Sequence, residues 1–379
     1  MCSFFSGGTP SSSKKEYYDG NIPFIRSGEL HDDQTELFIT EDGLKNSAAK
    51  MVEVGDLLLA LYGATSGDIA ISKINGAINQ AILCIRTEQS KKFIESIWYK
   101  HAGKLLQTYL QGGQGNLSAD IVKNISFYFA TIEEQKKLAK FISLLDERIS
   151  TQNKIIEDLK KLRSAIIDKL FCLPNKLVPQ MRLHGFTGNW IQVRLSDVCQ
   201  RIRTKNFNTQ CQLVLTIAAQ YGLVSQKDFF KKSIASDNLE GYYLIEKDDF
   251  AYNKSYSTDY PWGAVKRLEL YSQGVLSPLY ICFRPNTDII VPDYLSHYFE
   301  STKWHKGIAD IAGEGARNHG LLNLSVVDYF NTTHRIPSMP EQKVIADVLN
   351  KLTFKYDLEQ KLHENLLKQR RYLLQQMLI

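Results

Sequence analysis

Apolar residues alternate at spacings of three and four in two stretches of the chain, which is the pattern of a heptad repeat. One stretch lies within residues 131–171 and the other within residues 339–379. Each stretch predicts one long helix, which would extend about 58 Å at 1.5 Å per residue. Because both stripes belong to one chain, we expect the two helices to pair with each other. Further apolar positions widen each stripe and leave surface for another helix or subunit, although a buried hairpin without a further partner remains the alternative.

Both helices have the same start signal in the sequence. Thr131 precedes Glu134 by three residues, and Ser338 precedes Glu341 by three residues. This spacing is typical of a capping box, in which the hydroxyl and the carboxylate each bind a free backbone N–H of the first turn.

An internal repeat relates the two halves of the chain. Residues 116–118 (Asn-Leu-Ser) recur as residues 323–325, and residues 134–136 (Glu-Gln-Lys) recur as residues 341–343, both at a shift of 207. A third match, at a shift of 198, relates two runs that end in Cys-x-Arg, at Arg86 and Arg284. The repeat predicts a chain with the organisation A-B-A′-B′, in which each B is a long helix.

The segments before each long helix contain short β-rich runs that are separated by Gly, Asn and Pro. They predict two α+β globules, at residues 1–130 and 190–338, with a Pro- and Gly-containing linker at 172–189. The fold class expected is therefore α+β, with two globular domains separated by two long helices, at 131–171 and 339–379.

Composition narrows the class of protein. Of 379 residues, 44% are hydrophobic and 23% are charged, which favours folded domains over disorder, and no run is long enough to span a membrane. We therefore expect a soluble protein of the cytoplasm. The six cysteines have no zinc-ligand or disulfide spacing, so we expect reduced thiols and no metal. The net charge is only +5, and residues 1–132 carry 14 acidic against 12 basic residues, so any nucleic acid would be bound through shaped polar loops.

No catalytic motif is present. The sequence lacks a phosphate-binding loop, a nucleophile elbow and an H-E-x-x-H zinc motif. The glycines at 112, 113 and 115 are not followed by the Lys-Ser/Thr of a nucleotide-binding loop. We therefore expect a protein without enzymatic activity of its own.

Two loops are candidates for recognition, because each follows a predicted strand and carries hydroxyl groups, amides or aromatic rings. They are residues 61–68 (LYGATSGD) and 252–263 (YNKSYSTDYPWG). Such groups suit contacts with phosphates and base edges, whereas the alternative is an ordinary surface loop. The stretches Gln114–Asn116 and Arg317–His319, which precede the aligned Leu-Ser pairs, are candidates of the same kind, with a plain turn as their alternative.

These residues carry a family resemblance. SGGTP at 6–10, GNIPFI at 20–25, SGEL at 27–30, Gly55-Asp56 and GNLS at 115–118 resemble the target-recognition domain of a type I restriction-modification specificity subunit. In the second half, YNKS at 252–255, YPWG at 260–263 and Pro-Glu-Gln at 340–342 resemble a second such domain.

The resemblance implies a non-catalytic subunit whose two globules each read one half of a split site in double-stranded DNA. The long helices would pair antiparallel as a coiled-coil spacer and dock two modification (methyltransferase) subunits, which restriction subunits (ATP-dependent endonuclease and translocase) join. S-adenosylmethionine and ATP would bind those partners and not this chain. A coiled-coil tether with two ligand-binding globules unrelated to DNA is the alternative.

The residues expected to contact DNA lie in the candidate loops and the turns around them: Arg26, Tyr62, Thr65, Ser66, Asn79, Gln80, Gln114, Asn116, Lys205, Lys254, Ser255, Tyr256, Ser257, Arg317 and Asn318. The residues expected to dock other subunits are apolar positions on the outer faces of the helices: Ile155, Leu162, Leu358 and Leu362.

The first half departs from the family pattern at its start. The second half begins with residues 189–198 (NWIQVRLSDV), a segment that typically opens a recognition domain, whereas residue 1 aligns near Val198. We therefore expect the first globule to lack its opening strand.

Overall fold

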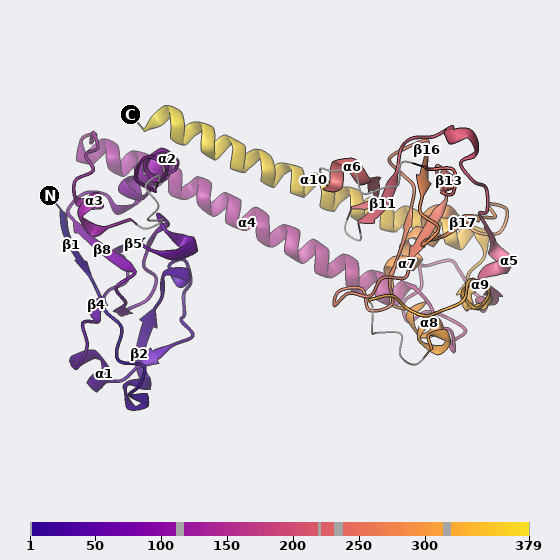
Figure 1. The fold of residues 1–379 in the computed structure, drawn as a ribbon, viewed down its shortest axis with the longest axis horizontal. Coiled ribbons are helices and arrows are strands. Elements are labelled where there is room, and N and C mark those ends of the chain that lie inside the picture. Colours follow the sequence, from indigo (N-terminus) through magenta and orange to yellow (C-terminus); the bar gives the residue numbers. More distant parts are fainter. Residues whose placement is uncertain (1, 111–116, 219–220, 231–237, 314–319, 379) are drawn as a thin grey trace. The chain divides into compact units, whose positions relative to one another are not determined.

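The computed structural model describes residues 2–110, 117–218, 221–230, 238–313 and 320–378 (Figure 1). The chain divides into two compact units. Unit 1 comprises residues 1–154 and 361–379, and unit 2 comprises residues 155–360. Each unit contains one α+β globule and one part of each long helix, so the α+β fold class is confirmed.

The globule of unit 1 is built on two four-stranded sheets, with strand orders β1-β8-β5-β6 and β3-β2-β7-β4. Its strands are β1 (Cys2–Ser6), β2 (Tyr18–Ile25), β3 (Phe38–Ile39), β4 (Lys50–Val52), β5 (Leu57–Ala60), β6 (Ile69–Ile71), β7 (Gly76–Ile78) and β8 (Ile82–Thr87). Its helices are α1 (Glu41–Lys45), α2 (Lys91–Leu110), α3 (Ala119–Lys123) and the long α4 (Ile132–Leu170), which continues into unit 2.

The globule of unit 2 repeats the first sheet as β10-β17-β14-β15 and adds three two-stranded sheets. Its strands are β9 (Ile191–Arg194), β10 (Cys199–Arg201), β11 (Leu215–Ala218), β12 (Gly222–Ser225), β13 (Tyr243–Glu246), β14 (Phe250–Asn253), β15 (Ala264–Arg267), β16 (Gln273–Leu276), β17 (Ile281–Pro285) and β18 (Thr333–Ile336). Its helices are α5 (Leu195–Val198), α6 (Gln226–Phe230), α7 (Pro292–Glu300), α8 (His305–Ile311), α9 (Val326–Asn331) and the long α10 (Met339–Met377), which continues into unit 1.

A buried glutamine attaches each long helix to its globule. Gln135 is 1% exposed, accepts a hydrogen bond from the backbone N–H of Ser90 at the start of α2 (3.1 Å) and donates to the carbonyl of Ala130. Gln342 does the same at the start of α7, where it accepts from the N–H of Val291 (2.8 Å). The repeated Glu-Gln-Lys triplet therefore marks this attachment, because only the glutamine is equally buried and equally bonded in both copies.

The start signals of the two helices have different outcomes. The predicted capping box at Thr131 is confirmed, since Glu134 accepts from the N–H of Thr131 and the Thr131 hydroxyl accepts from the N–H of Glu134. The box at Ser338 is wrong, because the side chain of Glu341 turns away and binds Arg182 of the linker and Trp190, the first residue of the second globule.

The long helices pair antiparallel within each unit. In unit 1, Arg370 of α10 forms an ion pair with Asp146 of α4, and Leu374 packs against Ile142. In unit 2, Arg163 of α4 donates to the hydroxyl of Thr353 of α10 at 3.0 Å, and Ile167 joins the same core cluster as Leu349. The two helices keep one register in both units, because the residue numbers of each facing pair (one from α4, one from α10) sum to 516. Arg163 and Arg370 are equivalent in the repeat.

His334 is expected to make the stability of unit 2 depend on pH. Its ring is buried between the hydroxyl groups of Tyr298 (2.8 Å) and Thr332 (2.9 Å), and desolvation lowers its pKa to about 4. Between pH 6.5 and 4 the unfolded chain binds a proton that the folded chain does not, so the free energy of unfolding falls as the pH falls. The loss amounts to about 3 kcal/mol at roughly 1.4 kcal/mol per pH unit.

We expect His334→Phe, which copies Phe127 of the repeat, to flatten this decline. Denaturant unfolding at pH 7, 5.5 and 4.5 measures it, and parallel slopes in the two proteins would contradict it.

Candidate nucleic-acid interface

An ion pair between a buried aspartate and a half-exposed arginine lies at the start of each strand that leads to a candidate loop. Asp56 is 5% exposed and pairs with Arg86 (2.8 Å), while Asp249 is 1% exposed and pairs with Arg284 (2.6 Å). Each aspartate also accepts a hydrogen bond from the backbone N–H three residues before it, which closes a tight turn in front of β5 or β14. Burial opposes ionisation of Asp56, but the hydrogen bonds from Arg86 hold the pKa of this carboxyl below its usual value.

Sequence reasoning did not assign these pairs. The signal was present, because the Cys-x-Arg run recurs at a shift of 198 and ends at Arg86 and Arg284. An arginine that recurs at the same strand position in both halves indicates a shared partner of opposite charge, and each half also has an aspartate just before the neighbouring strand. The repeat could therefore have led to Asp56 and Asp249.

The loop after β5 exposes only its tip. Leu61 is buried, and its carbonyl accepts from the N–H of Leu117 (2.9 Å) and from the hydroxyl of Ser66 (3.0 Å). Tyr62 is 37% exposed, and Thr65 is half-buried at the end of the 3-10 turn Gly63–Thr65. The loop therefore offers the Tyr62 ring and the Thr65 hydroxyl, whereas the Ser66 hydroxyl is used inside the loop.

A second turn lies beside this loop. The N–H of Leu61 binds the carbonyl of Ala81, which places the predicted residues Asn79 and Gln80 next to it. The carbonyl of Asn79 accepts from the N–H of Gly7, and the side chain of Gln80 accepts from the hydroxyl of Thr9. The structure thus places Asn79 and Gln80 against the Gly-Gly-Thr segment, on a turn that is hydrogen-bonded to the residue before Tyr62, and the Asn79 side chain accepts from the N–H of Ala81.

The corresponding loop of unit 2 is longer and carries a cation. Lys254 and Tyr256 are held by backbone hydrogen bonds, from Leu322 to the carbonyl of Lys254 and from Tyr256 to the carbonyl of Gly320. The Tyr256 side chain is 41% exposed, and in the part of the chain that the structure describes the Lys254 ammonium has no partner. Ser255 and Ser257 are also exposed, and the Ser257 hydroxyl accepts from the N–H of Tyr260.

Two of the candidate cations are engaged by the protein. Lys205 donates to the carbonyl of Gly241 (2.7 Å) and lies 3.8 Å from the centre of the Tyr243 ring. Arg26 forms ion pairs with Glu29 (2.9 Å) and Glu36 (2.6 Å). Both residues stay predicted DNA contacts. To bind DNA, either residue would have to share its N–H donors between DNA and its present partners in the protein.

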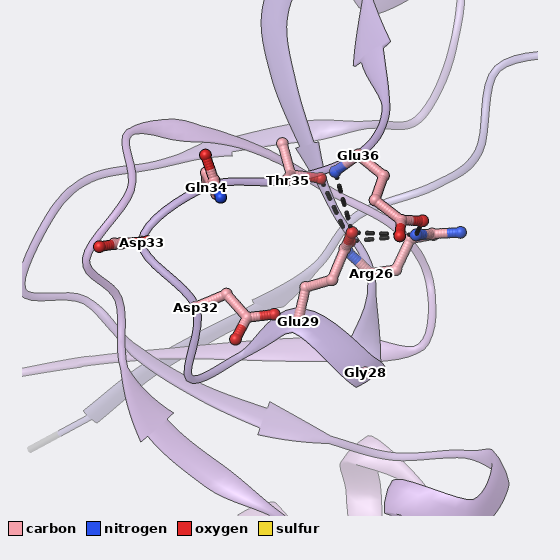
Figure 2. A pocket seen from close by; sticks show the side chains of 8 residues that line it. All are labelled: Arg26, Gly28, Glu29, Asp32, Asp33, Gln34, Thr35 and Glu36. Carbon is pink, nitrogen blue, oxygen red and sulfur yellow. Dashed lines mark hydrogen bonds and ion pairs between the residues drawn. The ribbon is translucent and has the colours of Figure 1, made fainter. Parts of the chain in front are cut away.

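Arg26 lines a pocket of about 690 Å³ (Figure 2). Figure 2 shows the Arg26 side chain directed toward Glu29 and Glu36, with Asp32 and Asp33 on the opposite wall. Burial would raise the pKa of Glu29, but hydrogen bonds from Arg26 and from the backbone of Glu36 lower it to about 2. Four carboxylates against one guanidinium make this pocket a poor place for a phosphate.

The remaining predictions divide in two. Gln114, Asn116, Arg317 and Asn318 lie outside the described residues. The apolar positions that we expect to dock other subunits are all exposed, by 39% to 50%: Ile155, Leu162, Leu358 and Leu362. Their exposure fits a docking role, which stays a prediction.

The described residues hold no group of three or more side chains that could bind a metal ion, and no helix among them is long and apolar enough to cross a membrane. All six cysteines are free thiols, and burial raises the pKa of Cys84 to about 12.

Comparison with known proteins shows which proteins the chain is similar to in sequence. Residues 1–161 match the family model of the type I restriction modification DNA specificity domain. Two curated relatives from Methanocaldococcus jannaschii are similar: the type I restriction enzyme MjaVIII specificity subunit (26% identity over 203 residues, 52% of this chain) and the MjaIX specificity subunit (28% over 176 residues, 44% of this chain). The matched parts span 46% and 40% of those two relatives.

Solved structures show the same fold over nearly the whole chain. The S subunit of a type I restriction-modification system from M. genitalium has a TM-score of 0.57 at 16% identity, and the match covers 100% of this chain and 94% of that one. A chain from a structure that concerns complex assembly and conformational transition of the type I R-M system has a TM-score of 0.59 at 14% identity, with 99% and 97% covered. The resemblance to type I specificity subunits that the sequence indicated is confirmed.

Proposed function

We propose that this chain, which resembles type I specificity subunits in sequence and in fold, reads a bipartite DNA site for a restriction-modification complex. One observation carries the proposal: the two globules share their framework and differ in the loop that this framework presents. The Asp56–Arg86 and Asp249–Arg284 pairs are equivalent, whereas the loop that follows the strand is short and uncharged at its tip in unit 1 and longer in unit 2, where it carries Lys254, Asp259 and several aromatic rings. Equivalent supports with different loops suit two different half-sites.

The chemistry of the loops supports direct contact with DNA. Lysine and exposed tyrosine and serine hydroxyls bind phosphates and base edges, and sequence is read through such base-edge contacts. The modest net charge of +5 means that general attraction to phosphate contributes less than shaped contacts.

The partners and cofactors follow from the same proposal. Modification subunits that hold S-adenosylmethionine, and restriction subunits that use ATP, would dock on the exposed apolar positions of the long helices. This chain would supply no cofactor site and no catalytic group. It would act in the cytoplasm with those subunits.

Removing the polar tip of the unit 2 loop tests the proposal. We expect the double variant Lys254→Ala with Tyr256→Ala to bind DNA roughly 10- to 100-fold more weakly, because a lost base contact costs about 1 to 3 kcal/mol. The recognised sequence should change in one half-site and stay the same in the other. The chain is co-expressed with its modification subunit, and single-molecule sequencing reports the methylated motif.

Tyr221→Ala is the matched control, because Tyr221 is 69% exposed in the β11–β12 hairpin, at a distance along the chain from the candidate loop. An unchanged motif at full methylation in the double variant would exclude these two residues from recognition. Failure of the native chain to bind DNA with its modification subunit would reject the proposal itself.

A further inference from the structure

The strand β10 of unit 2 begins a stripe of alternating cations. Arg201, Arg203 and Lys205 are each two residues apart, so their side chains lie on one side of an extended chain. Lys205 donates to the carbonyl of Gly241. Within the residues that the structure describes, the side chains of Arg201 and Arg203 have neither an ion pair nor a hydrogen bond. Their guanidinium groups, which carry several N–H donors each, are therefore available for an anion.

The two arginines line a groove of about 670 Å³. Its other walls are formed by α5, by α9 and by the residues that follow β17. Arg284 also lines the groove, but this side chain is already paired with Asp249. Asp197 is the one acidic residue in the lining, so the groove is cationic.

The backbone of β10 adds donors on the same side. β10 lies at the edge of its sheet, so one side of its backbone has no neighbouring strand. The N–H of Ile202 donates to the carbonyl of Cys282 in β17. Because successive residues of a strand alternate in direction, the N–H groups of Arg201 and Arg203 point away from β17. Backbone N–H groups, like arginine side chains, bind phosphate in protein–DNA complexes.

The strand register places this stripe beside the candidate loop of unit 2. β10 and β14 both pair antiparallel with β17, so they run in the same direction. Arg201 lies opposite Phe283, which in turn lies opposite Phe250. The same ladder carried on by two residues brings Arg203 level with Tyr252, where the candidate loop begins. Since neighbouring strands are about 4.8 Å apart, the two positions are about 10 Å apart.

The first globule has no cations at the equivalent positions. The registers of β1 with β8 and of β10 with β17 make Phe4 the equivalent of Arg201 and Ser6 the equivalent of Arg203. Phe4 packs against an apolar cluster of unit 1, and β1 contains no charged residue. The shared fold therefore does not require the two arginines, and a function specific to unit 2 accounts for them better.

We propose that Arg201 and Arg203 bind neighbouring phosphates of one DNA strand, beside the half-site that unit 2 reads. The inference rests on the proposed function and adds to it a phosphate anchor, formed by these two residues, that the first globule lacks at the equivalent strand. Side chains two residues apart on an extended strand are about 7 Å apart, so the pair presents a linear array of charge. Such contacts fix the position of a protein on the duplex without reading its sequence.

An acidic polypeptide is the other class of ligand with a suitable charge. The register favours DNA, because the stripe leads to the same end of the sheet as the loop that we propose to contact base edges. A polypeptide bound there would lie in the space beside the recognition loop that a duplex requires.

The salt dependence of DNA binding tests the phosphate anchor. The native chain and the variant Arg201→Ala with Arg203→Ala are each assembled with the modification subunit and titrated with DNA that carries the methylated motif, between about 50 and 200 mM salt. We expect the slope of log K against log salt concentration to become shallower by about 2, because each lost phosphate contact removes about 1. The methylated motif should stay the same in both half-sites, because phosphate contacts do not read sequence.

Two matched variants control for folding and for total charge. Arg201→Lys with Arg203→Lys keeps both charges and should keep the native slope. Lys176→Ala with Lys343→Ala removes two exposed cations of unit 2 that do not line the groove, and it should also keep that slope. Equal slopes for the native complex and the double alanine variant would overturn the proposal. Loss of the modification subunit from that variant in size-exclusion chromatography would show a protein-binding groove and would overturn it as well.

Uncharged phosphates locate the contact. Single phosphates beside either half-site are replaced by methylphosphonates in a set of duplexes. We expect adjacent positions beside one half-site, the one that changes in the Lys254→Ala with Tyr256→Ala variant, to weaken the native complex several-fold and to leave the double alanine variant unaffected. A native complex that binds its motif but shows no such position rejects the phosphate anchor alone. Failure of the native complex to bind DNA rejects the proposed function and the anchor with it.

Discussion

Arg182→Ala is expected to lower the free energy of unfolding of unit 2 by about 3 kcal/mol, because it leaves the Glu341 carboxylate buried without a cation. Both oxygens of Glu341 are bound by Arg182, and the carboxylate is 2% exposed against 19% for the guanidinium. Denaturant unfolding of the full chain, followed by tryptophan fluorescence, measures the loss.

Two further variants separate charge from packing. Arg182→Ala combined with Glu341→Gln should recover part of the stability, since an amide needs no counter-ion. Glu134→Ala at the equivalent exposed position of unit 1 should cost much less, because water can solvate the groups that the Glu134 carboxylate binds. A loss below 1 kcal/mol for Arg182→Ala would show that water reaches the Glu341 carboxylate.

Gly7→Ala is expected to destabilise unit 1 by on the order of 3 kcal/mol, because the backbone must move to admit the new methyl group. A Cβ atom at this position would lie 1.7 Å from the carbonyl oxygen of Ile78 in β7. The same shift would break the hydrogen bond from the N–H of Gly7 to the carbonyl of Asn79 and displace the turn that carries Gln80.

Gly28→Ala is the matched control, because no atom lies within 4 Å of the place that its new methyl group would take and its backbone is not left-handed. We expect a change within about 0.5 kcal/mol there. Thermal unfolding of the two variants decides the comparison, and equal melting temperatures would contradict the close approach at Gly7.

Periodicity predicted the long helices well because their apolar stripes are local patterns that tertiary contacts reinforce. The partners of charged side chains were harder to predict. The Ser338 box failed because Arg182, 159 residues away in the chain, offers Glu341 a stronger contact than a backbone N–H. Arg26 is a predicted DNA contact, but Glu29 and Glu36 form ion pairs with it, because the turn after β2 brings them next to it.

The loops show the same limit. Their positions after β5 and β14 followed from short strand patterns, whereas the choice of exposed side chain depends on hydrogen bonds that close each loop. Ser66 and Lys205 have suitable chemistry, yet their polar groups bind the carbonyls of Leu61 and Gly241. Composition cannot distinguish a hydroxyl that faces inward from one that faces solvent.

The common register of α4 and α10 has a consequence for inheritance. Arg163 and Arg370 occupy equivalent positions, and the residues of α4 and α10 face each other in the same register in both units. Recombination between two genes of this kind, at matching codons within either helix, would keep the heptad phase and the interhelical contacts. Such recombination can thus exchange a whole globule in a single genetic event while the rest of the chain remains unaltered.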